Sequence, residues 1–123
     1  MEYPNGHPTN RASGFMCPRC GGALWEQHNG TATAYECRIG DSLSEADLWI
    51  EHSVSRNQAL LTAARALAEN AALARHIAAS ADARGDTAVA ERLSQEAREE
   101  GRLYAQVQAM LEGLPEPEAS PDA

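Results

Sequence analysis

Three cysteines and one aspartate are the residues of this chain whose types and spacing suggest metal chemistry. Cys17 and Cys20 form a C-x2-C pair within CPRCGG, and Cys37 and Asp41 follow as C-x3-D. Two thiolates on a tight turn can grip one metal ion, because the proline and the paired glycines let the backbone fold closely around it. We therefore predict a zinc site whose ligands are Cys17, Cys20, Cys37 and Asp41.

The fourth ligand has alternatives. Structural zinc sites use mostly Cys and His, so water or His52 could stand in place of Asp41; His52 requires the following helix to fold back. His28 has suitable chemistry, but at about 3.3 Å per strand residue it would lie roughly 20 Å from the C-x2-C pair. Two readings without a metal also stay open, namely a hairpin with spare thiols and a redox C-x-x-C pair, although no βαβ pattern surrounds the latter.

A β-hairpin is predicted between the two ligand pairs. Residues 23–28 and 31–37 have strand character, and Asn29-Gly30 between them is a strong turn signal. Counting outward from this turn gives three facing pairs, which are Leu24 with Tyr35, Trp25 with Ala34, and Gly22 with Cys37. The last pair returns the third thiolate to the first two, which is the geometry of a zinc ribbon. A ribbon this small cannot bury enough apolar surface alone, so a metal is a plausible staple.

The remainder of the chain is predicted to be helical. Ser44 with Asp47 resembles a capping box, and a short helix carrying Leu48, Trp49 and Ile50 should follow. We expect some of these three to pack against Trp25 or Tyr35, the alternative being a ligand-binding aromatic patch. A long helix is then predicted from about residue 54 to 84, with apolar residues at three- and four-residue steps, which are Leu60, Leu61, Ala64, Leu67, Ala68, Ala71, Leu73 and Ile77.

A second long helix should run antiparallel to the first. Gly85 is the predicted C-cap and Asp86 the start of the new helix, and so short a link forces an αα-hairpin. Its apolar stripe is Val89, Leu93, Ala97, Leu103, Val107, Met110 and Leu114. Gly101 interrupts a helix at a cost of about 1 kcal/mol relative to Ala, which suggests a close helix contact there.

The predicted fold class is α+β, mostly α, as one domain or two small subdomains. In order, it has a flexible lead (1–14), a zinc-ribbon-like hairpin (15–43), a helical hairpin (44–114) and a disordered acidic tail (115–123). Two helices rarely bury enough surface alone, so a homodimer that completes a four-helix bundle is one expectation.

Charge and composition limit the function classes. The net charge is −8, every positive charge is Arg, and most of the acidic residues follow Ser44. Such a surface repels a phosphate backbone, so nucleic acid is an unlikely partner for the helical half.

No apolar run reaches the length of a membrane span, and the N-terminus lacks a signal-peptide pattern, so we expect a cytoplasmic protein. An odd cysteine count in a reducing compartment fits metal thiolates better than disulfides.

Nothing in the sequence predicts catalysis. There is no G-x-S-x-G elbow, Walker loop or dinucleotide fingerprint, and His52 and His76 lie on predicted helices. Glu36 and Glu45 are the nearest bases to the predicted zinc, which would need an open coordination position to act as a catalyst.

The motifs CPRCGGALWE and YECRIGD, with the helices that follow them, resemble a C-terminal extension of some bacterial chemotaxis protein-glutamate methylesterases. The similarity runs from about Phe15 to Leu114 and covers most of the chain; the ribbon motif is the specific part. In that family the motif reads CPxCGG with a later CRxGH, so Cys17, Cys20 and Cys37 match its cysteines and Asp41 stands where it has His. The matched region does not include the esterase domain, so demethylating activity does not transfer.

The resemblance implies a non-catalytic, zinc-binding module for protein interaction in chemotaxis-like or two-component signalling. The alternative is a zinc-ribbon nucleic-acid-binding or transcription-associated protein, in which Arg11, Arg19 and Arg38 would contact phosphates.

Overall fold

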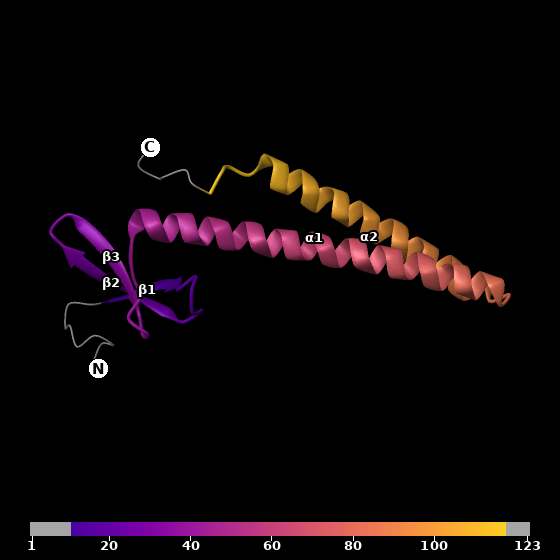
Figure 1. Ribbon diagram of the computed structural model, residues 1–123, viewed down its shortest axis with the longest axis horizontal. Coiled ribbons are helices and arrows are strands. Elements are labelled where there is room, and N and C mark those ends of the chain that lie inside the picture. Colours follow the sequence, from indigo (N-terminus) through magenta and orange to yellow (C-terminus); the bar gives the residue numbers. More distant parts are fainter. Residues whose placement is uncertain (1–10, 118–123) are drawn as a thin grey trace. The chain divides into compact units, whose positions relative to one another are not determined.

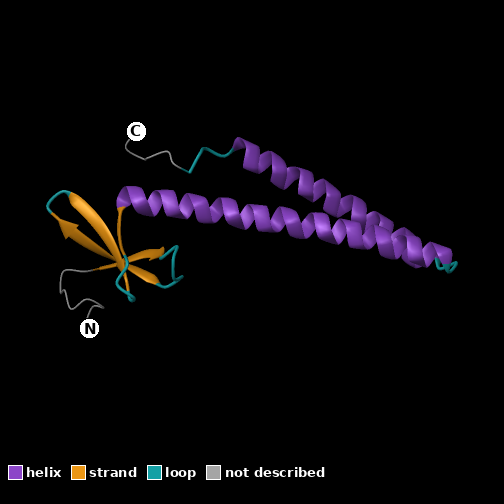
Figure 2. Ribbon diagram, in the orientation of Figure 1, coloured by secondary structure: helices purple, strands orange, loops and turns teal. Residues whose placement is uncertain are grey.

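The computed structural model describes residues 11–117 of the chain, so the predictions for residues 1–10 and 118–123 lie outside it. Four strands precede two helices (Figures 1 and 2), which confirms the α+β, mostly α class. The elements are β1 (Arg11–Met16), β2 (Ala23–Asn29), β3 (Ala32–Cys37), β4 (Ser42–Ser44), α1 (Glu45–Ala83) and α2 (Thr87–Gly113). The chain divides into two units within α1: the first holds the sheet and α1 up to Ser55, and the second spans Arg56–Pro115.

The hairpin of β2 and β3 forms as predicted, but its register differs by two residues. Leu24 faces Cys37 and Glu26 faces Tyr35, whereas counting from Asn29-Gly30 had paired Leu24 with Tyr35. Asn29 is the last residue of β2 and pairs with Ala32, so Gly30 and Thr31 are the two turn residues. Among the described residues, positive φ angles occur only at glycines, including Gly30 at 69°. A glycine with positive φ at the first turn position is what a type II′ turn requires, whereas an Asn-Gly type I′ turn would need positive φ at Asn29 too.

The sheet is larger than the predicted hairpin. It has four antiparallel strands in the order β1-β2-β3-β4. β1 begins at Arg11, and Arg11 and Ala12 pair with β2, so residues 11–14 belong to a strand and not to the predicted flexible lead. β4 pairs with β3, which places Leu43 opposite Tyr35.

The core of the first unit combines sulfur atoms with a few large side chains. Its buried members are Cys17, Leu24, Tyr35, Cys37, Leu43 and Leu48. Leu48 comes from the first turn of α1, so the prediction that this segment packs against Tyr35 is confirmed for Leu48. Trp49, by contrast, remains half exposed. Because two of the six core residues are cysteines, the packing of this unit depends on the state of its thiols.

The predicted short helix and the long helix that follows are one continuous helix of 39 residues. Ser44 caps it, since the Ser44 hydroxyl accepts a hydrogen bond of 3.0 Å from the backbone N–H of Asp47. The expectation of a break before Val54 was wrong because residues 50–56 contain no glycine or proline to interrupt the backbone ladder.

The caps between the helices follow the prediction. The N–H of Asp86 donates to the carbonyl of Ala81 (2.9 Å) and that of Gly85 to Asp82 (3.0 Å), which is the Schellman pattern with Gly85 at a φ of 80°. The Asp86 carboxylate then accepts from the N–H of Val89 at 3.3 Å and caps α2. The helices therefore run in opposite directions from this link (Figure 1).

Alanine, and not leucine, forms the buried seam of the helical hairpin. The buried residues of the second unit are Ala64, Ala71, Ala74, Ala78 and Ala81 on α1, and Ala97 on α2. From Ala71 to Ala81 the steps alternate between three and four residues, which is the heptad spacing of a coiled-coil seam. The Asn70 amide also donates to the Glu100 carboxylate across the hairpin at 3.4 Å.

The predicted apolar stripes are buried at Ala64, Ala71 and Ala97, whereas their larger side chains are half-buried or exposed. Leu73 is 54% and Ile77 37% exposed on α1, and Leu61, Leu103 and Met110 are exposed as well. Leu73, Ile77 and the half-buried Leu93 share one side of the hairpin, where they line a shallow depression. The other side is polar, with Arg75, Asp82, Glu91 and Arg98. No helix within residues 11–117 combines the length and the apolar character that crossing a membrane requires.

Replacing Gly101 with alanine should stabilise the protein by about 1 kcal/mol, because alanine is the better helix former. The prediction of a close contact at Gly101 was wrong, since a Cβ placed there meets no atom within 4 Å. Chemical denaturation monitored by circular dichroism measures the gain. Gly85→Ala is the matched control: it also has open space, but its φ of 80° makes alanine strained, so stability should fall. A loss of stability in Gly101→Ala would contradict this account.

Candidate metal centre

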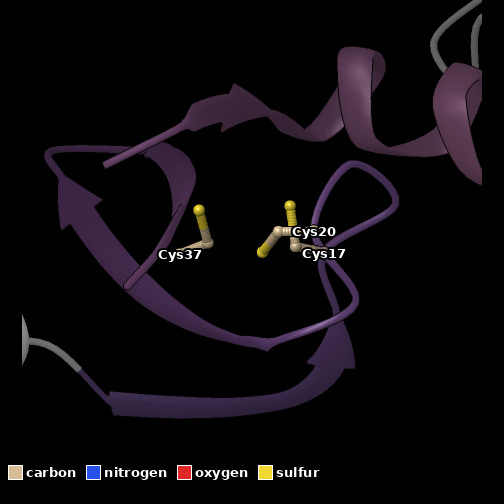
Figure 3. Close-up of side chains that lie close together, drawn as sticks. All are labelled: Cys17, Cys20 and Cys37. Carbon is tan, nitrogen blue, oxygen red and sulfur yellow. The ribbon is translucent and has the colours of Figure 1, made fainter. Parts of the chain in front are cut away.

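The three cysteines come together in the first unit, although 20 residues separate Cys17 from Cys37. The sulfur atoms of Cys17, Cys20 and Cys37 all lie within 4.8 Å of one another (Figure 3). Zn–S bonds of about 2.3 Å in a tetrahedral site put ligand sulfurs about 3.8 Å apart, so only a small adjustment closes the three on one ion. Cys17 and Cys37 are buried and Cys20 is exposed. This cluster is the arrangement that the spacing predicted.

A tight loop holds the first two cysteines. The N–H of Cys17 donates to the carbonyl of Gly22 at 2.7 Å, and the N–H of Gly21 donates back to the carbonyl of Cys17 at 2.8 Å. Gly21 has a φ of 76°, a conformation that other residues rarely adopt. The N–H of Gly22 points at the Cys20 sulfur at 3.4 Å. The two glycines thus close the loop and direct a backbone donor to a sulfur.

A second loop follows β3, with three residues between Cys37 and Asp41 where the first loop has two between its cysteines. The N–H of Cys37 donates to the carbonyl of Asp41, and the N–H of Gly40 donates to the carbonyl of Cys37, both at 3.1 Å. This loop brings the Asp41 side chain back toward the sulfur at its start. It therefore resembles the first loop, with an aspartate in the place of the second cysteine.

The surroundings of Cys37 favour its thiolate. Burial raises the pKa of the Cys37 thiol, but the backbone N–H groups of residues 39–41 and the Cys20 thiol donate toward the sulfur and lower the pKa below its usual value. Cys20 differs: the Gly22 N–H lowers its pKa, but burial and the thiols of Cys17 and Cys37 outweigh it and raise the pKa.

Asp41 lies beside the cluster on the Cys37 side. The Cys37 sulfur donates to Asp41 Oδ2 at 3.6 Å. A tetrahedral zinc ion with a sulfur at about 2.3 Å and an oxygen at about 2.0 Å holds those two ligands about 3.5 Å apart. The contact therefore has the length expected of neighbouring ligands. The mutually close group itself consists of the three sulfurs, so Asp41 binds only if its side chain moves inward.

Arg19, between the two cysteines of the first loop, faces carboxylates on two sides. It donates to Glu51 of α1 through Nε at 2.8 Å and Nη2 at 2.6 Å, a bidentate pair across 32 residues. Its Nη1 lies 3.7 Å from Asp41 Oδ1. The Glu51 carboxylate raises the pKa of Arg19, and Arg19 holds the pKa of Glu51 below its usual range. Arg19 thus ties the loop to α1 and orients Asp41 from outside the cluster.

The other candidate ligands lie elsewhere. His52 Nε2 is 2.8 Å from the carbonyl of Met16, which places the start of α1 against the end of β1 but leaves His52 outside the sulfur group. His28 contacts Glu26 and Thr33 on the hairpin, as its distance from the first loop predicted. The two histidines considered as fourth ligands, His52 and His28, therefore both contact other groups of the protein.

The bond between Arg19 and Glu51 was not predicted. Nothing in the sequence indicates that Arg19 pairs with Glu51. The two residues are separated by 31 others, and the register of the sheet decides whether they meet. The acidic residues in the first turn of α1, Glu45 and Asp47, are accounted for by the helix dipole and give no signal of Arg19.

Comparison with known protein families, curated proteins and solved structures found no match to this chain. The function therefore has to be argued from the geometry of the site itself.

Proposed function

We propose that this chain is a non-catalytic zinc-binding module whose helices mediate protein interaction. The convergence of the Cys17, Cys20 and Cys37 sulfurs within 4.8 Å is the observation that carries the proposal. Asp41, 3.6 Å from the Cys37 sulfur, supplies the fourth ligand. Thiolates with one carboxylate suit zinc, whereas magnesium and calcium prefer oxygen ligands alone.

A structural role for the metal explains the architecture of the first unit. Four short strands and one helical end enclose only six core residues, two of them cysteines. A metal that joins the loop after β1 to the loop after β3 ties the start of β2 to the end of β3 at the open end of the hairpin. Domains of this size commonly need such a staple. The surroundings also support a closed structural site over a catalytic one, because the nearby histidine, His52, is held by the Met16 carbonyl.

The metal content of the purified protein, with its stoichiometry, tests the proposal. We expect one zinc per chain, and a Co²⁺-substituted protein with the intense charge-transfer and d–d absorption of a tetrahedral thiolate site. A metal-free protein that takes up no zinc and melts at the same temperature with or without it would refute the proposal.

Substitutions at Asp41 test the fourth ligand. Asp41→His should tighten zinc binding, because imidazole is a preferred ligand of structural sites, and Asp41→Ala should weaken it by roughly 10-fold or more. Competition with a chromophoric chelator measures the three affinities. Glu51→Gln is a useful comparison, since it removes a partner of Arg19 without touching Asp41 or the sulfurs. Equal affinities in wild type, Asp41→His and Asp41→Ala would show that Asp41 is not a ligand.

In this proposal the helical hairpin is the surface that binds other proteins, and the partner that it binds is a second copy of the chain. The seam of the hairpin buries only alanines, while the larger side chains Leu73 and Ile77 remain exposed beside Leu93. Pairing two such apolar sides would complete a four-helix bundle. The motif resemblance supports a place in chemotaxis-like or two-component signalling, and the thiolate site suits a reducing, cytoplasmic compartment.

The structure offers little to the nucleic-acid alternative. Of the three arginines it would use, Arg19 is held in a bidentate pair by Glu51. Arg11 lies 3.4 Å from His28, and Arg38 stands in an exposed loop. A single unengaged arginine is a weak phosphate-binding surface, so filter binding to DNA or RNA should show no steep salt dependence.

A further inference from the structure

A second site lies on the first unit, away from the sulfur cluster. It is an apolar cleft of about 440 Å³ lined by six residues from three elements, which are Phe15 (β1), Tyr35 (β3), and Glu45, Leu48, Trp49 and His52 (α1). All of them precede Ser55, so one unit builds the whole cleft. Its volume falls within the range of ordinary small-molecule sites.

Aromatic rings form the walls of this cleft. Phe15 and Tyr35 meet edge to face, with centroids 6.4 Å apart and planes at 75°. Trp49 stands on α1 as a third wall. Phe15 and Trp49 are 54% and 46% exposed, whereas Tyr35 and Leu48 are buried and close the inner end. Two large rings are thus held open to solvent around a buried third ring.

The charge around the cleft is negative. Glu45 lines it, one helical turn before Trp49, and is exposed. Burial raises the pKa of the Tyr35 phenol, and the charges of Glu26 and Glu45 raise it further, so both carboxylates act on the inner end. No arginine is among the lining residues that the structure describes. His52, the one basic side chain, contacts the Met16 carbonyl through Nε2.

We infer that this cleft binds a small quaternary ammonium cation of the choline type. The negative faces of aromatic rings attract such a cation, and its methyl groups replace water on the apolar walls. A cation with N–H groups would lose hydrogen bonds to water that one carboxylate does not replace, whereas a quaternary nitrogen has none to lose. Glu45 supplies the counter-charge. This inference does not depend on the proposed zinc site or on the proposed protein interaction. It requires only that the sheet is folded.

Ligand-observed NMR with the zinc-loaded full chain tests this inference. Choline should bind with a millimolar or lower dissociation constant. Its neutral isostere 3,3-dimethylbutan-1-ol, in which carbon replaces the nitrogen, should bind on the order of tenfold more weakly. Equal binding of the two would overturn the inference, because the site would then be merely apolar. Absence of choline binding would overturn it as well.

Two variants place the binding in the cleft. Trp49→Ala should abolish the choline signal, and Glu45→Gln should weaken binding several-fold while leaving the neutral alcohol unaffected. Asp47→Asn is the matched control, since Asp47 is an exposed carboxylate of the same helical turn that does not line the cleft. Unchanged near-ultraviolet circular dichroism confirms folding of each variant. An equal loss in Asp47→Asn and Glu45→Gln would contradict the role of Glu45.

A further experiment distinguishes two sources of the quaternary ammonium group, a free small molecule and a methylated lysine side chain of another protein. A short peptide with one trimethyl-lysine presents the same cationic group on a backbone. We expect it to bind no more tightly than choline, because the lining residues provide one position for a cation and one carboxylate to neutralise it. Binding tenfold tighter than choline would overturn the assignment to a free ligand.

Discussion

Cys37→Ser is expected to abolish stoichiometric zinc binding and, with it, the folded sheet. Cys37 is the one thiolate that lies at the end of β3, so its loss leaves Cys17 and Cys20 on a single loop. The affinity for zinc should fall by more than roughly 10–100-fold, which is the usual effect of removing a residue that only hydrogen-bonds to a metal ligand. Because metal-binding free energy is folding free energy in such small units, the strands should lose their dispersed amide NMR signals.

Zinc analysis after gel filtration and a two-dimensional amide spectrum measure the two effects. Leu24→Ala is the control. Leu24 is fully buried and lies directly opposite Cys37, so alanine should destabilise the unit by about 2–5 kcal/mol without removing a ligand. Excess zinc should restore the Leu24→Ala spectrum but not that of Cys37→Ser. A Cys37→Ser protein that retains one tightly bound zinc would disprove the site.

The second large effect concerns self-association of the helices. Ile77→Glu should convert the proposed dimer to a monomer, because it places a charge among the apolar side chains of Leu73 and Leu93, beside the carboxylates of Glu96 and Glu100. Loss of an interface anchor of this kind typically costs 2 kcal/mol or more, which corresponds to a rise in the dimer dissociation constant of roughly 30-fold. Sedimentation equilibrium over a range of concentrations gives this constant directly.

Ala79→Glu tests whether the position of the charge matters. Ala79 is exposed on the same helix, two residues from Ile77, but lies on the polar side with Arg75 and Arg98. Both variants gain one glutamate on α1, so their net charge is the same. We expect Ala79→Glu to remain dimeric. A wild-type monomer at all concentrations, or equal dissociation of both variants, would remove the proposed interface.

The location of the candidate site could be predicted because it depends on local chemistry. A C-x2-C pair that is followed by two glycines favours a tight loop. The hairpin that comes next then brings Cys37 back to this loop. The predicted register was wrong by two residues, yet the sulfurs still met. Strand side chains alternate between faces with a period of two, so a shift of two residues leaves Leu24 and Tyr35 on the face they would otherwise occupy.

The caps were also set by the sequence. Ser44, Gly85 and Asp86 each act on backbone groups within five residues, so their effect does not depend on the remainder of the fold. The start of α1 and the antiparallel link between α1 and α2 therefore followed from residues that lie close together in the chain.

The tertiary structure alone decided which side chains are buried. On the sequence, Leu73 and Ala74 are equally good members of an apolar stripe, but α2 approaches on the alanine side and leaves Leu73 exposed. The same holds for the pairing of Arg19 with Glu51 and for the aromatic cleft, which join residues 20 or more positions apart. Such contacts depend on the summed packing of strands and helices, and no local pattern of residues encodes that sum.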